Sequence, residues 1–184
     1  MTENLATSSA PFSVRCFEAR DRAALQALGL VDATPAPPSP EAKEALANSA
    51  EDATDGKVHV WVAEAVDQVI GAVAVIHDNA SLAHLKYLCV APGLAGWRDV
   101  ASELAETAIK DAYDRGYLKL VVHTPLPPSR LTTHLHYLGF EFSRERLLGE
   151  EHALEFYLNL YQRPPAWLSD DQALMAVRID GDKP

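Results

Sequence analysis

Residues 82–123 read LAHLKYLCVAPGLAGWRDVASELAETAIKDAYDRGYLKLVVH, and the spacing of their apolar residues changes twice. Residues 82–90 have the apolar and aromatic composition of a strand. From Trp97 to Arg115 the apolar residues follow helical spacing, and Gly116 is placed to end the helix. Residues 118–123, rich in leucine and valine, form another strand. A strand, a helix and a strand in this order predict a right-handed crossover between two roughly parallel strands.

The flanking sequence extends this unit into a larger sheet. Apolar side chains alternate in four further stretches, so strands are predicted at residues 12–19, 58–65, 69–77 and 154–160. Three strands in the middle of the chain are joined by short turns and form an antiparallel meander. Short helices are expected after Asp21, which can cap one that Gly29 ends, near residues 41–49, and after Ser129, with Leu131, Leu135 and Leu138 facing the core. The fold class is therefore α/β.

Length and composition are those of one globular domain. The chain has 184 residues, of which 48% are hydrophobic and 23% charged, so one sizeable core is expected. We predict a flexible leader at residues 1–11, the domain at residues 12–162 and a C-terminal tail at residues 163–184. No stretch reaches the length of a membrane span, and the N-terminus lacks the basic and apolar segments of a secretory signal.

The net charge and the cysteine content indicate which binding partners and which cellular compartment to expect. The formal net charge is −10, and no run of lysine and arginine offsets it, which argues against a nucleic-acid partner. Cys16 and Cys89 each lie in an apolar, strand-like run, where a small buried thiol is the usual occupant. A reducing cytoplasm fits this cysteine usage.

The turn between residues 90 and 97 is the most informative part of the chain. It contains Gly93 and Gly96 and opens a long helix, whose first amide groups have no partner within the helix. Such a helix N-terminus attracts anions, phosphate among them. Because every strand-to-helix loop has these parts, ordinary turn chemistry explains this loop equally well when it is considered alone.

The order of the elements, the Val-x-Pro turn at Val90 and the Leu138-Gly139-Phe140 sequence together resemble the GNAT superfamily of N-acetyltransferases. The resemblance runs from residue 12 to residue 161. It implies a mixed, mostly antiparallel central sheet of about seven strands with flanking helices. It also implies that the fourth and fifth strands, residues 82–90 and 118–123, splay apart to admit the pantetheine arm of acetyl-CoA. Acetyl-CoA is therefore the expected co-substrate.

The same resemblance implies a set of cofactor-binding residues. Backbone groups of the fourth strand would pair with pantetheine at Leu88, Cys89 and Val90. Amides of the turn and helix that follow would meet the pyrophosphate, namely those of Ala95, Gly96, Trp97, Arg98, Asp99 and Val100. Gly96 alone is retained from the glycine-rich pattern of the family. Arg98 replaces a glycine, so its guanidinium either contacts phosphate or obstructs it, and Asp99 adds a negative charge.

The proton chemistry cannot follow the common family pattern. Many members place a tyrosine four residues before the Gly-Phe pair, where its hydroxyl protonates the leaving thiolate; Leu135 stands there in this chain. Pro128 stands where an asparagine is often found. We therefore consider the histidines, which titrate near neutral pH. His84 is the first choice for the base, because histone-type members have a glutamate base at that position.

Other side chains are secondary candidates. His134 and His136 flank position 135, and His123 ends the fifth strand, so each could supply a proton. Tyr87, beside the splayed strand, could face the acceptor. For each of them, an ordinary hydrogen-bonded or packing side chain is the alternative interpretation. His134 and His136 diverge on a helix, and no carboxylate follows at the fourth position, so no metal site is predicted.

Two functions fit these features. The first is N-acetyl transfer from acetyl-CoA directly to the amine of a small molecule or peptide, with backbone N–H groups of the fourth strand steadying the oxyanion. The second is a binding or regulatory module of the same fold that has lost efficient catalysis, which the missing tyrosine, asparagine, arginine and glycine features favour. Cys89 is not expected to be a nucleophile, because no activating group lies beside it. A homodimer is a further expectation, since this fold often pairs through its late strands.

Overall fold

The computed structural model describes residues 11–28, 58–125, 130–148, 151–162, 165 and 167–168. One sheet of seven strands, in the order β1-β2-β3-β4-β5-β7-β6, forms the centre of this part of the chain. The strands are β1 (Ser13–Cys16), β2 (Val58–Ala65), β3 (Gln68–Asn79), β4 (Leu82–Val90), β5 (Lys119–Pro125), β6 (Glu141–Leu148) and β7 (Glu151–Asn159). Among the described strands, only β4 and β5 pair in parallel. The predicted mixed, mostly antiparallel sheet is thus confirmed.

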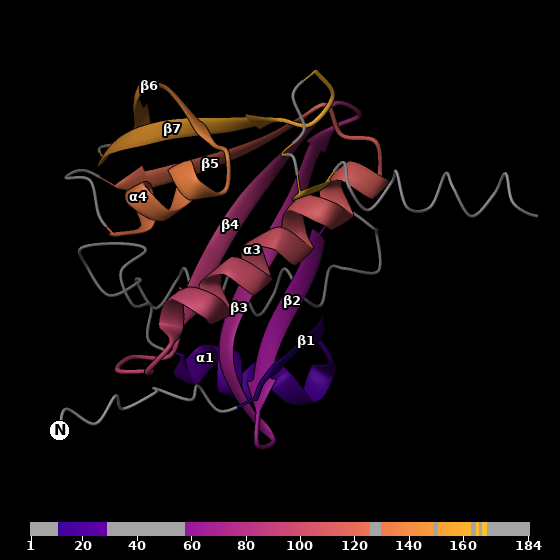
Figure 1. The fold of residues 1–184 in the computed structure, drawn as a ribbon, viewed down its shortest axis with the longest axis vertical. Helices are drawn as coiled ribbons and strands as arrows, with labels where there is room; N and C mark the ends of the chain where they lie inside the picture. Colours follow the sequence, from indigo (N-terminus) through magenta and orange to yellow (C-terminus); the bar gives the residue numbers. More distant parts are fainter. Residues whose placement is uncertain are drawn as a thin grey trace, which may run out of the picture.

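Helices cover both faces of the sheet. α3 (Trp97–Asp114) and α4 (Arg130–Tyr137) lie on one face, whereas η1 (Ala19–Asp21) and α1 (Arg22–Ala27) lie on the other (Figure 1). The buried stripe of α3 has the helical spacing expected from the sequence. Gly116 follows α3 with a φ of +81°, the left-handed conformation in which glycine commonly ends a helix. Since α3 joins the parallel neighbours β4 and β5, the predicted crossover is also confirmed.

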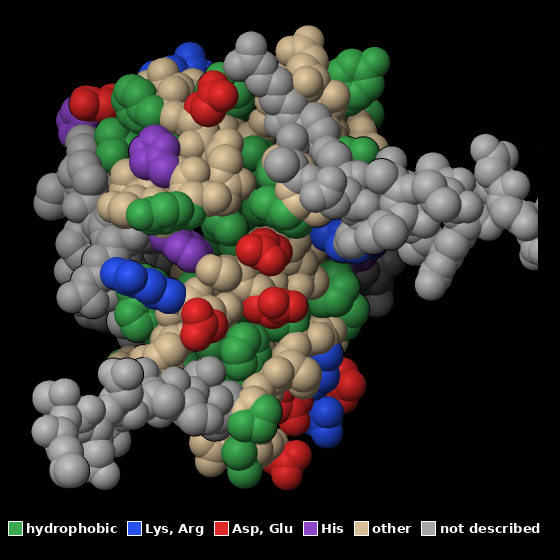
Figure 2. All heavy atoms as spheres, in the orientation of Figure 1, with side chains coloured by type: hydrophobic (Ala, Val, Ile, Leu, Met, Phe, Trp, Pro, Cys, Tyr) green, Lys and Arg blue, Asp and Glu red, His purple; other side chains and the backbone are tan. Residues whose placement is uncertain are grey.

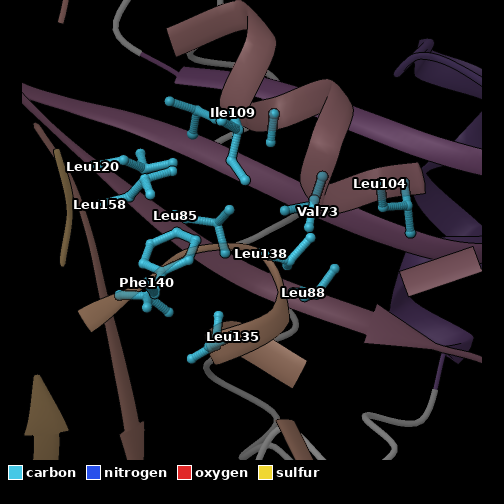
Figure 3. Close-up of a cluster of buried hydrophobic side chains, with 14 of the residues drawn as sticks. Val73, Leu85, Leu88, Leu104, Ile109, Leu120, Leu135, Leu138, Phe140 and Leu158 are labelled. Carbon is cyan, nitrogen blue, oxygen red and sulfur yellow. The ribbon is translucent and has the colours of Figure 1, made fainter. Parts of the chain in front are cut away.

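Two apolar clusters hold these layers together. The larger lies between the sheet and helices α3 and α4, and includes Leu85, Leu104, Ile109, Leu135 and Phe140 (Figure 3). The smaller lies between the sheet and α1 and is built from Leu25, Leu28 and the inward-facing residues of β2 and β3. Because side chains alternate along a strand, each central strand contributes to both clusters.

The first half of α3 packs closely against β3 at Gly71. A Cβ atom added to Gly71 would lie 2.9 Å from the carbonyl oxygen of Cys89 and 2.9 Å from Cδ1 of Leu104. Real Cβ atoms do not approach other atoms so closely, so a residue without a side chain is required there. This contact fixes α3 against the end of β4 and thereby positions the loop that joins them.

One strand, β6, was not predicted from the sequence. Every residue from Glu141 to Leu148 is exposed. The strand lies at the edge of the sheet and pairs with β7 alone. Because neither of its faces is buried by the described residues, the sequence lacks the alternation of apolar and polar residues that revealed the other strands.

Two expectations about the first strand and helix are wrong. Asp21 makes no side-chain hydrogen bond that caps α1; its carboxylate instead accepts hydrogen bonds from Arg15 (2.6 and 2.8 Å) and from the backbone N–H of Glu18 (2.8 Å). Cys16 is exposed rather than buried, because β1 is a four-residue edge strand that pairs only with β2. Cys89, by contrast, is buried as predicted.

Some predicted features lie outside the described residues. They are Gly29, the helix near residues 41–49, Pro128, Ser129 and the side chain of Leu131. Of the expected leader only Pro11 is described. Within the expected C-terminal tail, Trp167 packs against the larger cluster and Leu168 is 2% exposed inside it. This short part of the tail therefore contributes to the core.

Candidate active site

β4 and β5 run side by side over three residue pairs and then part. The pairs are Leu82 with Lys119, Ala83 with Leu120, and His84 with Val121. Beyond them, β4 continues to pair with β3, and β5 with β7. The later residues of β4 therefore have one backbone edge that no described strand pairs with, and such an edge can bind an extended ligand. This is the splayed strand pair that the resemblance implied.

A bulge in β4 lies beside the opening. Lys86 pairs with Ala74 and Cys89 with Ala72, so Tyr87 and Leu88 together oppose one residue of β3. Tyr87 has a φ of +57°, which a bulky residue seldom adopts. Bulges bend a strand and re-aim its backbone groups, and strained backbone concentrates at functional sites. The sequence contains no glycine here that would have revealed the bulge.

The loop after β4 turns sharply before α3 begins. Gly93 and Gly96 have φ values of +71° and +77°, the left-handed conformation that glycine adopts without strain. The N–H of Ala91 donates to the carbonyl of Ile70 at 2.7 Å, which ties the start of the loop to β3. A Cβ atom on Gly93 would meet no other atom within 4 Å, so the loop surface is open at this point.

The end of this loop presents amide groups outward. The first amides that find an acceptor in α3 are those of Asp99 and Val100, which donate to the carbonyl of Gly96 at 3.0 and 3.4 Å. The amides of Trp97 and Arg98 come before them at the start of the helix, where no earlier helical carbonyl exists. The start of α3 therefore carries the partial positive charge that binds phosphate.

The side chains of Trp97 and Arg98 lie together at this helix start. The guanidinium carbon of Arg98 is 5.6 Å from the centroid of the Trp97 ring, within the range of a cation–π contact. Arg98 and Asp99 are exposed, whereas Trp97 is half-buried against the larger cluster. Arg98 thus adds a full positive charge beside the outward amides, and Asp99 offsets part of it.

α4 brings His134 to the same end of α3. Its Nε2 lies 3.3 Å from Oγ of Ser102, and its ring centroid is 6.5 Å from that of Trp97. Burial, and to a lesser degree the charge of Arg98, lowers the pKa of His134, so the ring is neutral at neutral pH. The next residue, Leu135, is fully buried and points into the core (Figure 3).

His84 lies on the opposite face of the sheet from His134. Its neighbour Leu85 packs in the cluster beneath α3, and side chains alternate along the strand, so His84 points towards the α1 face. There its ring stacks on that of His123, with centroids 5.8 Å apart. The structure therefore brings His84 together with His123 and places His134 elsewhere.

The surroundings of His84 favour its neutral form. Burial is the main cause that lowers its pKa, and the charges of Lys86 and His123 lower it further. Asp78 acts in the opposite direction, with Oδ2 3.8 Å from Nε2 of His84. A neutral imidazole has a lone pair that can accept a proton, which is the property required of a general base.

The same face of the sheet carries a buried carboxylate that no pattern in the sequence indicated. It belongs to Glu155 of β7, which is 7% exposed. It accepts hydrogen bonds from His123 (3.2 Å), Ser143 (3.1 Å) and Arg144 (3.0 Å), and Arg146 lies 3.2 Å away. Burial alone would raise the pKa of Glu155, but the hydrogen bonds and the charge of Arg146 outweigh it, so the pKa lies below its usual range.

The remaining polar groups near the opening are held in apolar surroundings. Burial raises the pKa of the Cys89 thiol to about 12, so it is protonated and cannot serve as a nucleophile. Tyr87 is half-buried against the cluster beneath α1, and burial raises the pKa of its phenol. Thr124 of β5 is 1% exposed, and its hydroxyl has no hydrogen-bond partner in the described part of the chain. No pattern in the sequence singles out Thr124.

A pocket of about 570 Å³ lies on the α1 side of the sheet. It is lined by residues of β1, η1, α1 and the turn between β2 and β3, and by Ala91 and Pro92. Arg15 is fixed in its wall between Asp21 and Glu64, and the guanidinium keeps the pKa of Asp21 below its usual range. The lining contains no histidine, so we do not place acyl transfer in this pocket.

The outer surface of α3 is acidic. Figure 2 shows acidic side chains over this helix, where Asp99 and Glu103 are exposed.

The described residues contain no group of three His, Cys, Asp or Glu side chains placed to hold a metal ion. Among the described helices, none combines the length and the apolar composition needed to cross a membrane.

The sequence was compared with known families and curated proteins. A profile of the Acetyltransferase (GNAT) family matches residues 28–140, which is more than half of the 184 residues. The matched segment contains β2, β3, β4, α3, β5 and α4, and therefore the whole opening described above. A search of curated proteins finds no match.

Solved structures share the fold at low sequence identity. The ribosomal-protein-S18-alanine N-acetyltransferase of Escherichia coli is 14% identical, with a TM-score of 0.66 over 83% of this chain and 96% of that one. The PaiA N-acetyltransferase of Thermoplasma acidophilum, solved with coenzyme A, is 16% identical, with a TM-score of 0.63 over 79% and 98%. The aminoglycoside 6'-N-acetyltransferase of Enterococcus faecium is 12% identical, with a TM-score of 0.63 over 83% and 99%.

Proposed function

The chain belongs to the GNAT family of acetyltransferases, and from this premise we propose that it transfers the acetyl group of acetyl-CoA directly to an amine. Acetyl-CoA is the co-substrate of this family. The observation that carries the proposal is the parting of β4 and β5 after His84 and Val121, a few residues before the loop that opens α3. The unpaired edge of β4 is followed along the chain by the start of α3. An extended thioester that carries a pyrophosphate requires both features, one after the other.

The residues present fit acetyl-CoA in two ways. The pantetheine arm is extended and carries amide groups, so it can pair with the backbone of β4 at Leu88, Cys89 and Val90. The pyrophosphate is anionic and suits the amides between Ala95 and Val100. The exposed guanidinium of Arg98 suits phosphate as well, because a charge-assisted hydrogen bond to phosphate is among the stronger ones.

Direct transfer needs one proton to leave the amine. The amine nitrogen bonds to the acetyl carbon, the carbon–sulfur bond breaks, and the sulfur leaves with the bonding pair as a thiolate, which is finally protonated. We assign the removal of the amine proton to His84, because its ring is neutral and lies where the strands part. Backbone N–H groups at the bulge of β4 stabilise the carbonyl oxygen as it gains negative charge.

His134 and Tyr87 have supporting roles in this proposal. His134 belongs to the α3 and α4 side, where the neutral ring donates or accepts a hydrogen bond near the leaving sulfur, and solvent supplies the proton. Tyr87, at the bulge, contributes its phenol as a neutral hydrogen-bonding group on the acceptor side. Neither residue replaces the missing family tyrosine as the general acid.

The acceptor is an amine of a small molecule or a peptide. The structural neighbours include enzymes whose names give an alanine of a ribosomal protein and an aminoglycoside as acceptors. We place the acceptor on the α1 face, since His84 points there. We further propose that residues 12–162 form the transferase domain and that this domain acts in the cytoplasm. We also propose that the protein forms a homodimer, which light scattering of the purified protein would test.

Binding of the co-substrate is the first test. At an acetyl-CoA concentration of 100 times the dissociation constant, a binder gains about 2.7 kcal/mol of stability, which raises its melting temperature clearly. Desulfo-CoA should give a similar shift, because the proposed contacts involve the nucleotide and the pantetheine rather than the sulfur. A melting temperature unchanged at millimolar acetyl-CoA would contradict the proposal.

Turnover is the second test. Release of CoA thiol should be measured against a panel of polyamines, aminoglycosides, amino acids and peptides with free N-termini. His84→Ala should lower kcat by about 100-fold or more while the dissociation constant for acetyl-CoA is kept. His152→Ala, an exposed histidine of β7, is the matched control and should leave both quantities unchanged. A thermal shift without turnover for any acceptor would favour the non-catalytic binding module.

A further inference from the structure

Three ionisable side chains form a row across three neighbouring strands. His84 of β4 pairs with Val121 of β5, and His123, two residues further along β5, pairs with Glu155 of β7. Because side chains two apart on a strand share a face, His84, His123 and Glu155 all point to the α1 face. The row begins where β4 and β5 part and ends at a carboxylate that is 7% exposed.

The contacts along the row fix the orientation of His123. A carboxylate only accepts hydrogen bonds, so Nε2 of His123, 3.2 Å from Oε2 of Glu155, must carry a hydrogen. Glu155 is held in turn by Ser143, Arg144 and Arg146. The ring of His123 then stacks on that of His84 at an interplanar angle of 21° and a centroid distance of 5.8 Å.

We propose that His123, anchored by Glu155, is a positioning residue that holds the ring of His84 at the opening between β4 and β5. The proposal rests on the proposed function, in which His84 accepts the proton of the amine. In many enzymes a buried carboxylate orients a histidine and thereby fixes the direction of a proton-accepting ring. Here the carboxylate of Glu155 orients His123, which is not itself the base. The ring of His123 stacks on the ring of His84 and donates no hydrogen bond to it.

The charges around the row also disfavour a proton on His84. The carboxylate nearest to His84 is that of Asp78, which is 53% exposed and 3.8 Å away, so it stabilises a charge on His84 only weakly. Lys86 faces His84 from its own strand and repels such a charge. His123 likewise lowers the pKa of His84 through its charge, which favours the neutral form of the base.

NMR titration of the imidazole rings tests the coupling without any acetyl donor. In the full chain, His123→Gln should raise the titration midpoint of His84, because a competing positive charge is removed. Glu155→Gln should change the tautomer signals of the His123 ring, and Glu155→Asp should restore them in part. His152→Gln, the same substitution at an exposed position of β7, should leave the His84 midpoint unchanged. Equal His84 midpoints in the wild type and in His123→Gln would overturn the proposal.

Kinetics test the positioning role. His123→Gln should lower kcat about 10-fold to 100-fold, leave the KM for acetyl-CoA unchanged and shift the acid limb of the kcat profile to higher pH. A structural role alone would lower stability without shifting the profile. An unshifted profile with an unchanged kcat would overturn the proposal. If no acceptor is acetylated but the NMR coupling is present, the proposed function fails while the interaction between the rings stands.

Discussion

His84 and Val121 form the last pair of the parallel ladder between β4 and β5. Each strand is held beyond that point by its other neighbour, β4 by β3 and β5 by β7. The opening is therefore built into the sheet by its hydrogen bonding and does not depend on a mobile loop. On the far side of β4, the contact of Gly71 with Cys89 and Leu104 holds the first half of α3 close to the sheet.

Enlarging Gly71 should destabilise the protein and displace α3. In Gly71→Val the new side chain would clash with the backbone carbonyl of Cys89 and with the side chain of Leu104. We expect a loss of about 1–3 kcal/mol or more in the free energy of unfolding, measured by urea denaturation, and weaker binding of acetyl-CoA. Gly71→Ala should show the same effects to a smaller extent.

Gly93→Ala is the matched control for that experiment. A Cβ atom at Gly93 meets no atom within 4 Å, so only the backbone conformation, with φ of +71°, is strained. The expected loss is about 1 kcal/mol. Equal stabilities of the Gly71 and Gly93 variants would contradict the close packing of α3 on β3.

The sequence predicted the βαβ unit well because its signals are local. The spacing of apolar residues and Gly116 placed the long helix within one residue of α3, and the bounds of β4 agree at both ends. The exposed strand β6 could not be predicted, since neither of its faces is buried by the described residues. Asp21 shows another limit: its sequence position suits a helix cap, but Arg15 and the backbone of Glu18 bind its carboxylate instead.

The candidate site was harder to predict because it depends on contacts between distant residues. The loop before α3 was found from its two glycines and the long helix that it opens, and His84 from the family resemblance. The hydrogen bond between His123 and Glu155 joins residues 32 positions apart, and so does the contact between Ser102 and His134. Neither follows from the composition or periodicity of its own segment. They depend on the register of β5 with β7 and on the packing of α4 against α3.

Removing the charge of Arg98 should weaken the binding of acetyl-CoA. The side chain is exposed beside the outward amides at the start of α3, where it can reach a phosphate. A charge-assisted hydrogen bond contributes about 1.5–3 kcal/mol, so Arg98→Gly should raise the dissociation constant by about 10-fold or more in titration calorimetry. The effect should shrink as salt is added.

Lys110→Gly provides the control for Arg98→Gly. Lys110 is also exposed on α3 but lies more than three turns further along the helix. Its replacement should leave the dissociation constant unchanged, although the glycine will cost some helix stability. Tighter binding by Arg98→Gly would show instead that the native side chain obstructs the phosphate.

The two cysteines should differ sharply in reactivity. Cys16 is exposed on an edge strand, whereas Cys89 is buried and has a pKa of about 12. A thiolate is the reactive form, so Ellman's reagent should modify only Cys16 in the native protein and both thiols in guanidinium. Cys16→Ser should abolish the native reaction. Rapid modification of Cys89 in that variant would mean that the sheet opens far more readily than its packing indicates.

Stability should fall at mildly acidic pH, and His77 should account for part of the fall. Its ring stacks on Tyr117 at a centroid distance of 4.8 Å and contacts the edge of His59 at 5.3 Å. Both ring nitrogens are buried, and neither has a hydrogen-bond partner among the described residues. Burial chiefly, and then the charges of His59 and Arg115, lower the pKa of His77 below its ordinary value.

The direction of the pH effect follows from this lowered pKa. Below about pH 6.5 the unfolded chain binds a proton at His77 that the folded protein does not bind until the pH reaches the lower folded pKa. The contribution of His77 to stability is therefore complete above about pH 6.5 and is lost as the pH falls towards the folded pKa. The midpoint of urea unfolding should drop between about pH 8 and about pH 5.5. In His77→Phe, which keeps an aromatic ring against Tyr117, the drop should be smaller, whereas His152→Phe should behave as the wild type. An equal drop of the unfolding midpoint in all three proteins would mean that protonation of His77 does not destabilise the folded protein.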